Sequence, residues 1–197
     1  MIAFGSCGCA GQPEGGPHLY WIYLAPMTAP SPDPEGTFIA NKFTVRRYRQ
    51  AVVARYRDQI AEAIRLRFTE RYIEPATTCH AHGFTLMAIS CLMLEALESF
   101  RRGWKKSSNQ SEKLFVEFLD REPDFAAFRG RGAEFYADVR GAILHQAETT
   151  HGWRILRSGP LFDGSRTINA AAFIRELERA LNTYCEGLKR APWGSEP

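Results

Sequence analysis

Apolar residues recur every four positions between residues 48 and 72, and this spacing predicts a long amphipathic helix. Proline has no backbone N–H for a helix interior, so Pro75 is expected to end it. The apolar stripe consists of Tyr48, Val52, Tyr56, Ile60, Ile64, Phe68 and Tyr72.

The pattern downstream predicts further helices. Residues 80–102 contain FTLMAISCLMLEALESF, which is apolar on nearly every face and typical of the most buried helix of a bundle. KKSSNQS then indicates a loop, and residues 111–119 indicate a third helix. RGRG is expected to be a flexible turn, and it leads into a fourth helix over residues 133–148.

Two short extended pieces are expected around Gly159 and Pro160, in the arrangement of a small hairpin, before a last helix that starts near Asn169. The predicted fold class is therefore all-α, with a bundle of four to five helices and a small extended or hairpin insert before the last helix.

The 197 residues suffice for one domain with its own core. Residues 1–38 are rich in glycine and proline and are expected to be irregular. Residues 39–190 are expected to form the helical domain, and residues 191–197 a frayed tail.

The five cysteines are few and widely spaced, which favours a reducing compartment over a disulfide framework. No apolar run approaches the roughly 18 residues of a membrane span, so a cytoplasmic protein without a membrane partner is expected. Cys79, His80 and His82 are too close in sequence to complete a tetrahedral site alone. Neither a metal nor a cofactor is therefore expected.

The net charge of +3 is too small to indicate a nucleic-acid partner, but its distribution is uneven. Residues 42–71 hold nine Lys and Arg against three Asp and Glu, a surplus of six. Such a face is able to follow a phosphate backbone, with Arg46, Arg47 and Arg49 as candidate RNA-binding residues. A solvated basic face of an ordinary amphipathic helix is an equal alternative.

Arg140 and His145 on the fourth helix carry the main candidate chemistry. Histidine moves protons near neutral pH, and the arginine fork fits phosphate oxygens. RNA supplies its own 2′-OH nucleophile, so the pair needs no metal. Five residues of α-helix rotate by about 500°, which leaves the two side chains roughly 140° apart. A second copy facing the first would bring them together, so a homodimer is expected. The structural alternative is a solvated arginine and a histidine at the helix C-terminus.

The run VRGAILHQAET, followed by HGWRI and INAAAFIRELERAL, resembles helical domains of the HEPN superfamily. The resemblance covers residues 41–189 and the order of the helices. It implies a dimeric bundle in which an arginine, four to six further residues and a histidine form a metal-independent ribonuclease site. Such proteins occur in toxin–antitoxin and abortive-infection systems. The sequence departs from many active members at Gly141, where they carry a polar residue.

Glu95 lies inside the apolar second helix, where a carboxylate must be paired, protonated or directed at a site. It is a candidate for positioning Arg140 or His145, and an ion pair with Arg101 or Lys105 is the alternative. The resulting hypothesis is an endoribonuclease of HEPN type that leaves 2′,3′-cyclic phosphate ends. An antitoxin or another partner protein would control it. The second hypothesis is a non-catalytic module that binds a nucleotide or a partner.

Overall fold

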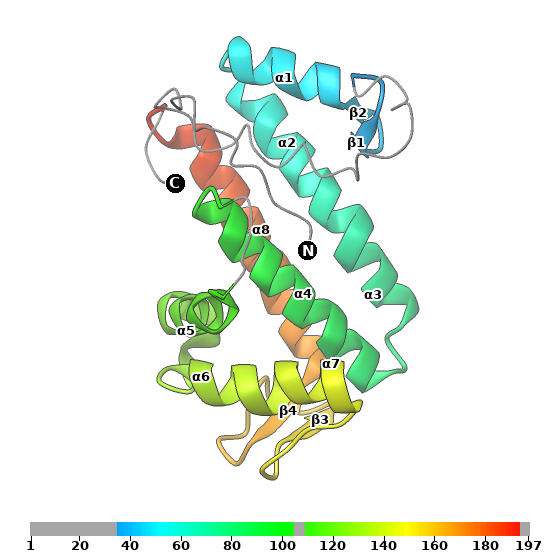
Figure 1. Ribbon diagram of the computed structural model, residues 1–197, viewed down its shortest axis with the longest axis vertical. Coiled ribbons are helices and arrows are strands. Elements are labelled where there is room, and N and C mark those ends of the chain that lie inside the picture. Colours follow the sequence, from blue (N-terminus) through cyan, green and yellow to red (C-terminus); the bar gives the residue numbers. More distant parts are fainter. Residues whose placement is uncertain (1–34, 105–108, 194–197) are drawn as a thin grey trace, which may run out of the picture.

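The computed structural model describes residues 35–104 and 109–193, and their fold is mostly helical with two small sheets (Figure 1). The Gly/Pro-rich residues 1–34, residues 105–108 with Lys105, and residues 194–197 lie outside this part. In chain order the elements are β1 (Phe38–Ala40), β2 (Phe43–Thr44), α1 (Val45–Val53), α2 (Arg57–Phe68), the π-helical turn η2 (Thr69–Ile73), α3 (Glu74–Thr78), α4 (Gly83–Arg101), α5 (Ser111–Arg121), the 3₁₀ turn η3 (Pro123–Phe128), α6 (Gly132–Phe135), the π-helical turn η4 (Tyr136–Gly141), α7 (Ala142–Gln146), β3 (Arg154–Leu156), β4 (Thr167–Asn169) and α8 (Ala170–Arg190).

The prediction of a single long first helix is wrong, because the helix is interrupted between α1 and α2. Arg55 takes a left-handed φ of +57° at this break, and Tyr56 is exposed. Pro75 does not end the helix either, but lies in the first turn of α3. Here η2 shifts the backbone hydrogen bonds to residues five apart, a local change that accommodates a residue without an N–H.

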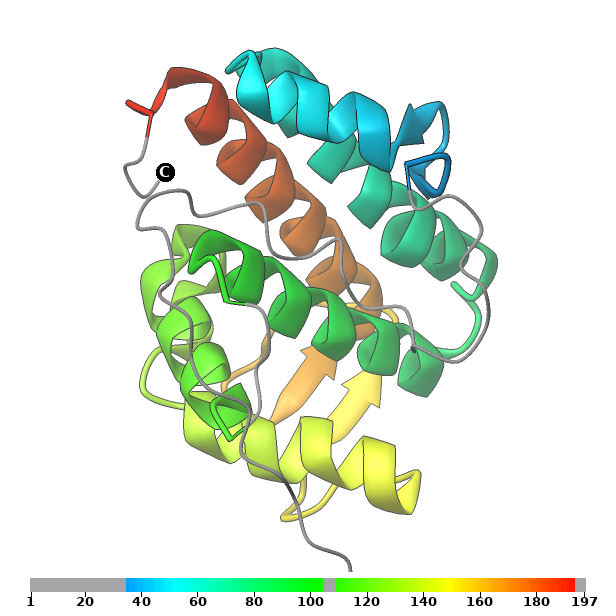
Figure 2. The same ribbon diagram turned by 45° about the horizontal axis from the view of Figure 1, so that its top comes forward.

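Helices α4 and α8 run together through the middle of the molecule, with α2 and α3 along the side of α8 (Figures 1 and 2). The prediction that residues 80–102 form a buried helix is confirmed, since Leu94 and Leu97 of α4 are fully buried. The last helix also begins as expected, and the Asn169 side chain caps it by accepting the N–H of Ala172.

Among the described helices, α4 alone is long and apolar enough to cross a membrane, with 19 residues and a mean hydropathy of 1.4. Of its most apolar stretch, 56% is buried against the rest of the fold. Core helices of soluble proteins pass the same test of length and composition, and the packing of α4 against α5 and α8 is that of a core helix.

The fourth expected helix is a continuous rod of α6, η4 and α7. It crosses one end of the α4 and α8 pair, and α1 lies at the opposite end in both views (Figures 1 and 2). The turn expected at RGRG is present at Arg129 and Gly130, and Gly132 already belongs to α6. A Cβ on Gly132 would come within 2.4 Å of the Cα of Val116, so only glycine allows α6 to lie this close to α5.

The extended insert before α8 is confirmed, but the expected hairpin is wrong. Strand β3 pairs with β4 in parallel, with Arg154 opposite Thr167. A separate antiparallel bridge joins Phe162 to Ile168. The chain reverses twice, first in the bend that contains Gly159 and again after Asp163, whose carboxylate accepts the N–H groups of Ser165 and Thr167.

Candidate functional site

Arg140 lies near the end of η4 and is held by Glu95 of α4. Its Nη2 donates to the Glu95 Oε2 at 2.9 Å, and the side chains are 17% and 12% exposed, respectively. The alternative pairing of Glu95 with Arg101 is not present, because Arg101 donates to Glu122 at 2.5 Å. The structure therefore brings two of the three predicted catalytic residues into contact.

The surroundings fix the orientation of both side chains. Ser111 Oγ donates to the second oxygen of Glu95 at 2.7 Å, and the Arg140 guanidinium lies 5.3 Å from the centre of the Tyr136 ring. Glu95 takes one N–H of Arg140, while the Arg140 Nε is buried without a hydrogen-bond partner. A guanidinium has five N–H groups, so Arg140 keeps donors for a further acceptor.

Gly141 has a local structural role in the π turn. A Cβ at this position would lie 3.3 Å from the carbonyl oxygen of Tyr136, closer than nearly all such contacts. Glycine therefore suits the backbone of η4, and π turns of this kind are frequent at functional sites. The departure from the family pattern at Gly141 thus coincides with the π turn that carries Arg140.

His145 lies in the last turn of α7 and is exposed. Within residues 35–104 and 109–193, no hydrogen bond or ion pair involves its ring or joins it to Arg140. Four of the six residues from Arg140 to His145 belong to α7, so the two side chains keep much of the α-helical rotation that separates them. One chain by itself therefore does not bring His145 to Arg140.

Two exposed leucines flank the Glu95 and Arg140 pair. Leu144 follows Arg140 by four residues and is 39% exposed, and Leu92 precedes Glu95 by three and is 45% exposed. Helix positions three or four apart share a face, and α4 contacts α7. The ion pair therefore has an apolar rim on both helices.

The structure does not bring the predicted RNA-binding residues near Arg140. Arg46, Arg47 and Arg49 lie on α1, at the end of the molecule opposite the helix that carries η4 (Figures 1 and 2). Arg47 donates to the carbonyl of Lys42 at 3.0 Å, and Arg49 pairs with Glu35. Two of these side chains therefore contribute local contacts around the β1–β2 hairpin.

Two other arginines of the basic segment lie closer to the pair. Burial raises the pKa of Tyr72, the charges of Arg67 and Arg71 lower it, and the charge of Glu95 raises it. Arg67, Arg71 and Glu95 therefore act on the same phenol. Arg67 and Arg71 both belong to the basic segment of residues 42–71. Only the packing of η2 against α4 distinguishes them from the other basic residues of that segment.

Sequence reasoning also missed a partner for His151. Its Nδ1 lies 2.7 Å from the Asp138 Oδ1, and Thr150 Oγ1 donates to the same oxygen at 3.0 Å. Asp138 precedes Arg140 by two residues, or about 200° of helix rotation. This cluster is on the far side of the helix and ties the loop before β3 to it.

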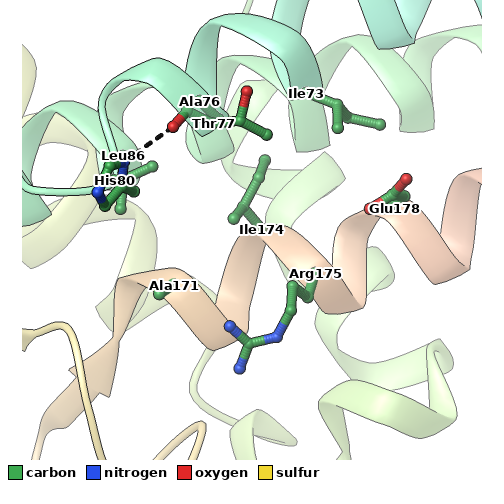
Figure 3. Close-up of a pocket in the computed structure, with 9 residues that line it drawn as sticks. All are labelled: Ile73, Ala76, Thr77, His80, Leu86, Ala171, Ile174, Arg175 and Glu178. Carbon is green, nitrogen blue, oxygen red and sulfur yellow. Dashed lines mark hydrogen bonds between the residues drawn. The ribbon is translucent and has the colours of Figure 1, made fainter.

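The Cys79, His80 and His82 segment lies beside a cavity of 240 Å³ between α3, α4 and α8 (Figure 3). His80 helps to line it, and its Nδ1 donates to the carbonyl of Thr77 at 2.9 Å. In the described residues no group of three or more His, Cys, Asp or Glu side chains is placed to hold a metal ion. None of the predicted catalytic or RNA-binding residues lines this cavity.

Comparison with protein-family models, with curated proteins and with solved structures finds no match to the chain.

Proposed function

We propose that this protein is a cytoplasmic, metal-independent endoribonuclease of HEPN type, with a composite site at a homodimer interface. The observation that carries the proposal is the ion pair of Arg140 with Glu95, formed between helices 45 residues apart in the sequence. A half-buried guanidinium that keeps unused donors, in a π turn five residues before an exposed histidine, is suited to holding a phosphate.

In this mechanism Arg140 binds the scissile phosphate and stabilises the negative charge of the transition state. The 2′-oxygen forms a bond to phosphorus, and the bond from phosphorus to the 5′-oxygen breaks. His145 accepts the proton of the 2′-OH or donates one to the leaving oxygen. The products are a 2′,3′-cyclic phosphate and a 5′-OH end. Glu95 keeps Arg140 in position and does not touch the RNA.

The dimer follows from the separation of the two motif residues in one chain. A two-fold contact across α7 places His145 of each copy near Arg140 of the other. The exposed side chains of Leu92 and Leu144 supply apolar area at the rim of the ion pair. Static light scattering is expected to report about twice the chain mass of 22.3 kDa. A monomer at micromolar concentration contradicts the composite site.

The biological setting proposed is stress or phage defence, in which a toxin-like ribonuclease is held inactive by an antitoxin or another partner protein. One observation favours the second hypothesis, a non-catalytic module for a nucleotide or partner. Arg140 is only 17% exposed, as an arginine with a structural role would be. The two functions differ in whether RNA is cut.

The test compares cleavage of total RNA by the wild type, Arg140→Ala and His145→Ala. Loss of the histidine is expected to slow cleavage by roughly 10²–10⁴-fold, and loss of the arginine by about 10²–10³-fold. Both variants are expected to keep the helical circular dichroism spectrum. Cleavage is expected to continue in EDTA and to require a 2′-OH at the scissile position.

His151→Ala is the matched control, because this histidine is also exposed and close in sequence but pairs with Asp138 on the far side of the helix. It is expected to cut RNA like the wild type. If neither the wild type nor any variant cuts RNA and His145→Ala weakens nucleotide binding, the binding module replaces the ribonuclease. If Arg140→Ala and His145→Ala match the wild type in every assay, both functions fail.

A further inference from the structure

Arg67, near the end of α2, and Arg71, within η2, are two cations that have no acidic partner among the described residues. Four residues separate them, so their side chains lie close together on the same side of this helix. Neither has an ion pair or a hydrogen bond in the described part of the chain. Arg71 is exposed, and Arg67 is half-buried.

The surroundings of Arg67 disfavour its charge. Its pKa is lowered to about 10, chiefly by burial and also by the charge of Arg71, while the phenols of Tyr72 and Tyr48 act in the opposite direction. Burial removes part of the water around the Arg67 guanidinium, and no carboxylate of the described residues pairs with this guanidinium in its place. A bound anion would offset both the lost hydration and the repulsion between the two arginines.

Two carboxylates near this pair, Glu70 and Glu62, are engaged elsewhere. Both oxygens of Glu70 accept the backbone N–H of Asn41, at 2.7 and 2.8 Å. Glu62 holds Arg65 at 2.7 Å. Glu70 and Glu62 therefore do not pair with Arg67 or Arg71.

This region adjoins the proposed site. Both π turns, η2 and η4, pack against α4. The charge of Glu95 on α4 raises the pKa of Tyr72, whereas the charges of Arg67 and Arg71 lower it. Three arginines and one carboxylate are thus linked through Tyr72 and Glu95, because Arg67, Arg71 and Glu95 all act on the Tyr72 phenol and Arg140 pairs with Glu95. This surplus of positive charge is suited to a polyanion that extends past Arg140.

We propose that Arg67, Arg71 and Tyr72 form a second phosphate subsite, which takes a phosphodiester of single-stranded RNA next to the one held by Arg140. The inference rests on the proposed function for its substrate, and it adds where the chain of the RNA runs. Two guanidinium forks hold the phosphate oxygens, and the Tyr72 hydroxyl is a further donor. The RNA therefore follows α4 from η4 toward η2, and not toward α1.

The test measures binding of fluorescent oligoribonucleotides to the full chain carrying His145→Ala, which slows cutting. The probes are a dinucleotide, with one phosphodiester, and a hexanucleotide, with five. Replacing Arg67 or Arg71 by Gln is expected to weaken hexanucleotide binding at least threefold more than dinucleotide binding. The slope of log affinity against log salt is expected to fall by about 0.7 for each arginine removed.

Arg57→Gln is the matched control, because Arg57 lies on the same helix about 15 Å before Arg67 and has no ion pair in the described part. It is expected to leave the length dependence and the salt slope unchanged. Equal losses for Arg57→Gln and Arg71→Gln would reduce the subsite to a general effect of positive charge and overturn it.

The remaining outcomes separate the subsite from the proposed function. If the Arg67 and Arg71 variants lose hexanucleotide binding while the wild type never cuts RNA, the subsite stands and the ribonuclease falls. If the wild type cuts RNA and both variants bind the hexanucleotide like the His145→Ala parent, the subsite falls alone. If the two variants lose affinity for ADP but not for the hexanucleotide, the phosphate comes from a free nucleotide and the RNA subsite is overturned.

Discussion

Glu95 and Glu98 lie one turn apart on α4, yet they belong to two different kinds of charged cluster. Glu98 has no exposed surface, and it accepts Arg121 at 2.5 Å and Arg102 at 3.0 Å. Arg102 also pairs with Glu117, and Arg101 pairs with Glu122. Three arginines thus meet three glutamates, and the cluster joins α4 to α5 with its charges balanced.

The charges near Glu95 are balanced differently, because Glu95 pairs with Arg140, while Arg67 and Arg71, which act with Glu95 on the Tyr72 phenol, have no carboxylate partner in the described residues. Burial alone does not distinguish the clusters, since the side chain of Glu95 is also only 12% exposed. The surplus of cations distinguishes the two clusters, because unpaired buried charge is unfavourable for the fold and is typical of sites that receive an anion. The comparison predicts that the Glu98 cluster supports stability and, under the proposed function, that the Glu95 cluster serves the site.

The largest expected effect is on stability, from Glu98→Ala. It leaves two arginines without the buried carboxylate that they share, and breaking such a buried pair costs about 3–5 kcal/mol. That is a large part of a typical free energy of unfolding of about 5–15 kcal/mol. Urea unfolding followed by circular dichroism measures the change. Glu112→Ala, an exposed change on α5, is the control and is expected to stay within about 0.5 kcal/mol. A Glu98→Ala protein as stable as this control would remove the structural half of the comparison.

A smaller effect on stability, joined to an effect on activity, is expected from Glu95→Gln. The amide keeps a hydrogen bond to Arg140 but loses the charge, which is expected to lower the free energy of unfolding by about 1–2 kcal/mol. Loosened positioning of Arg140 is expected to lower kcat roughly tenfold. KM for RNA is expected to fall or stay constant, because a negative charge beside the phosphate site is gone. Steady-state cleavage assays separate this pattern from a purely structural role, in which kcat falls and KM rises.

The smallest effect on stability is expected from Arg67→Gln. Removing a half-buried charge that has no carboxylate partner is expected to leave the free energy of unfolding within about 0.5 kcal/mol of the wild type, or to raise it. Thermal unfolding in low salt measures it. A loss above 2 kcal/mol would show that Arg67 supports the fold, and the contrast with the Glu98 cluster would then disappear.

Much of the helical framework was predictable because it depends on local pattern. The apolar run of α4 and the start of the last helix near Asn169 are each encoded within a few turns of the chain. The same holds for the presence of an extended insert before α8. Arg140, His145 and Glu95 were selected as a motif and a buried carboxylate, without any knowledge of their distances.

The tertiary structure decided how these elements meet. It placed Glu95 against Arg140, paired β3 with β4 in parallel, and separated Arg46, Arg47 and Arg49 from the motif helix. The two π turns and the break at Arg55 follow from packing, because their hydrogen bonds differ from an α-helix by a single residue in register. Periodicity along a sequence reports which face of a helix is apolar. Which charges share a side of α4 depends on contacts between residues up to 45 positions apart, and only the folded chain fixes those.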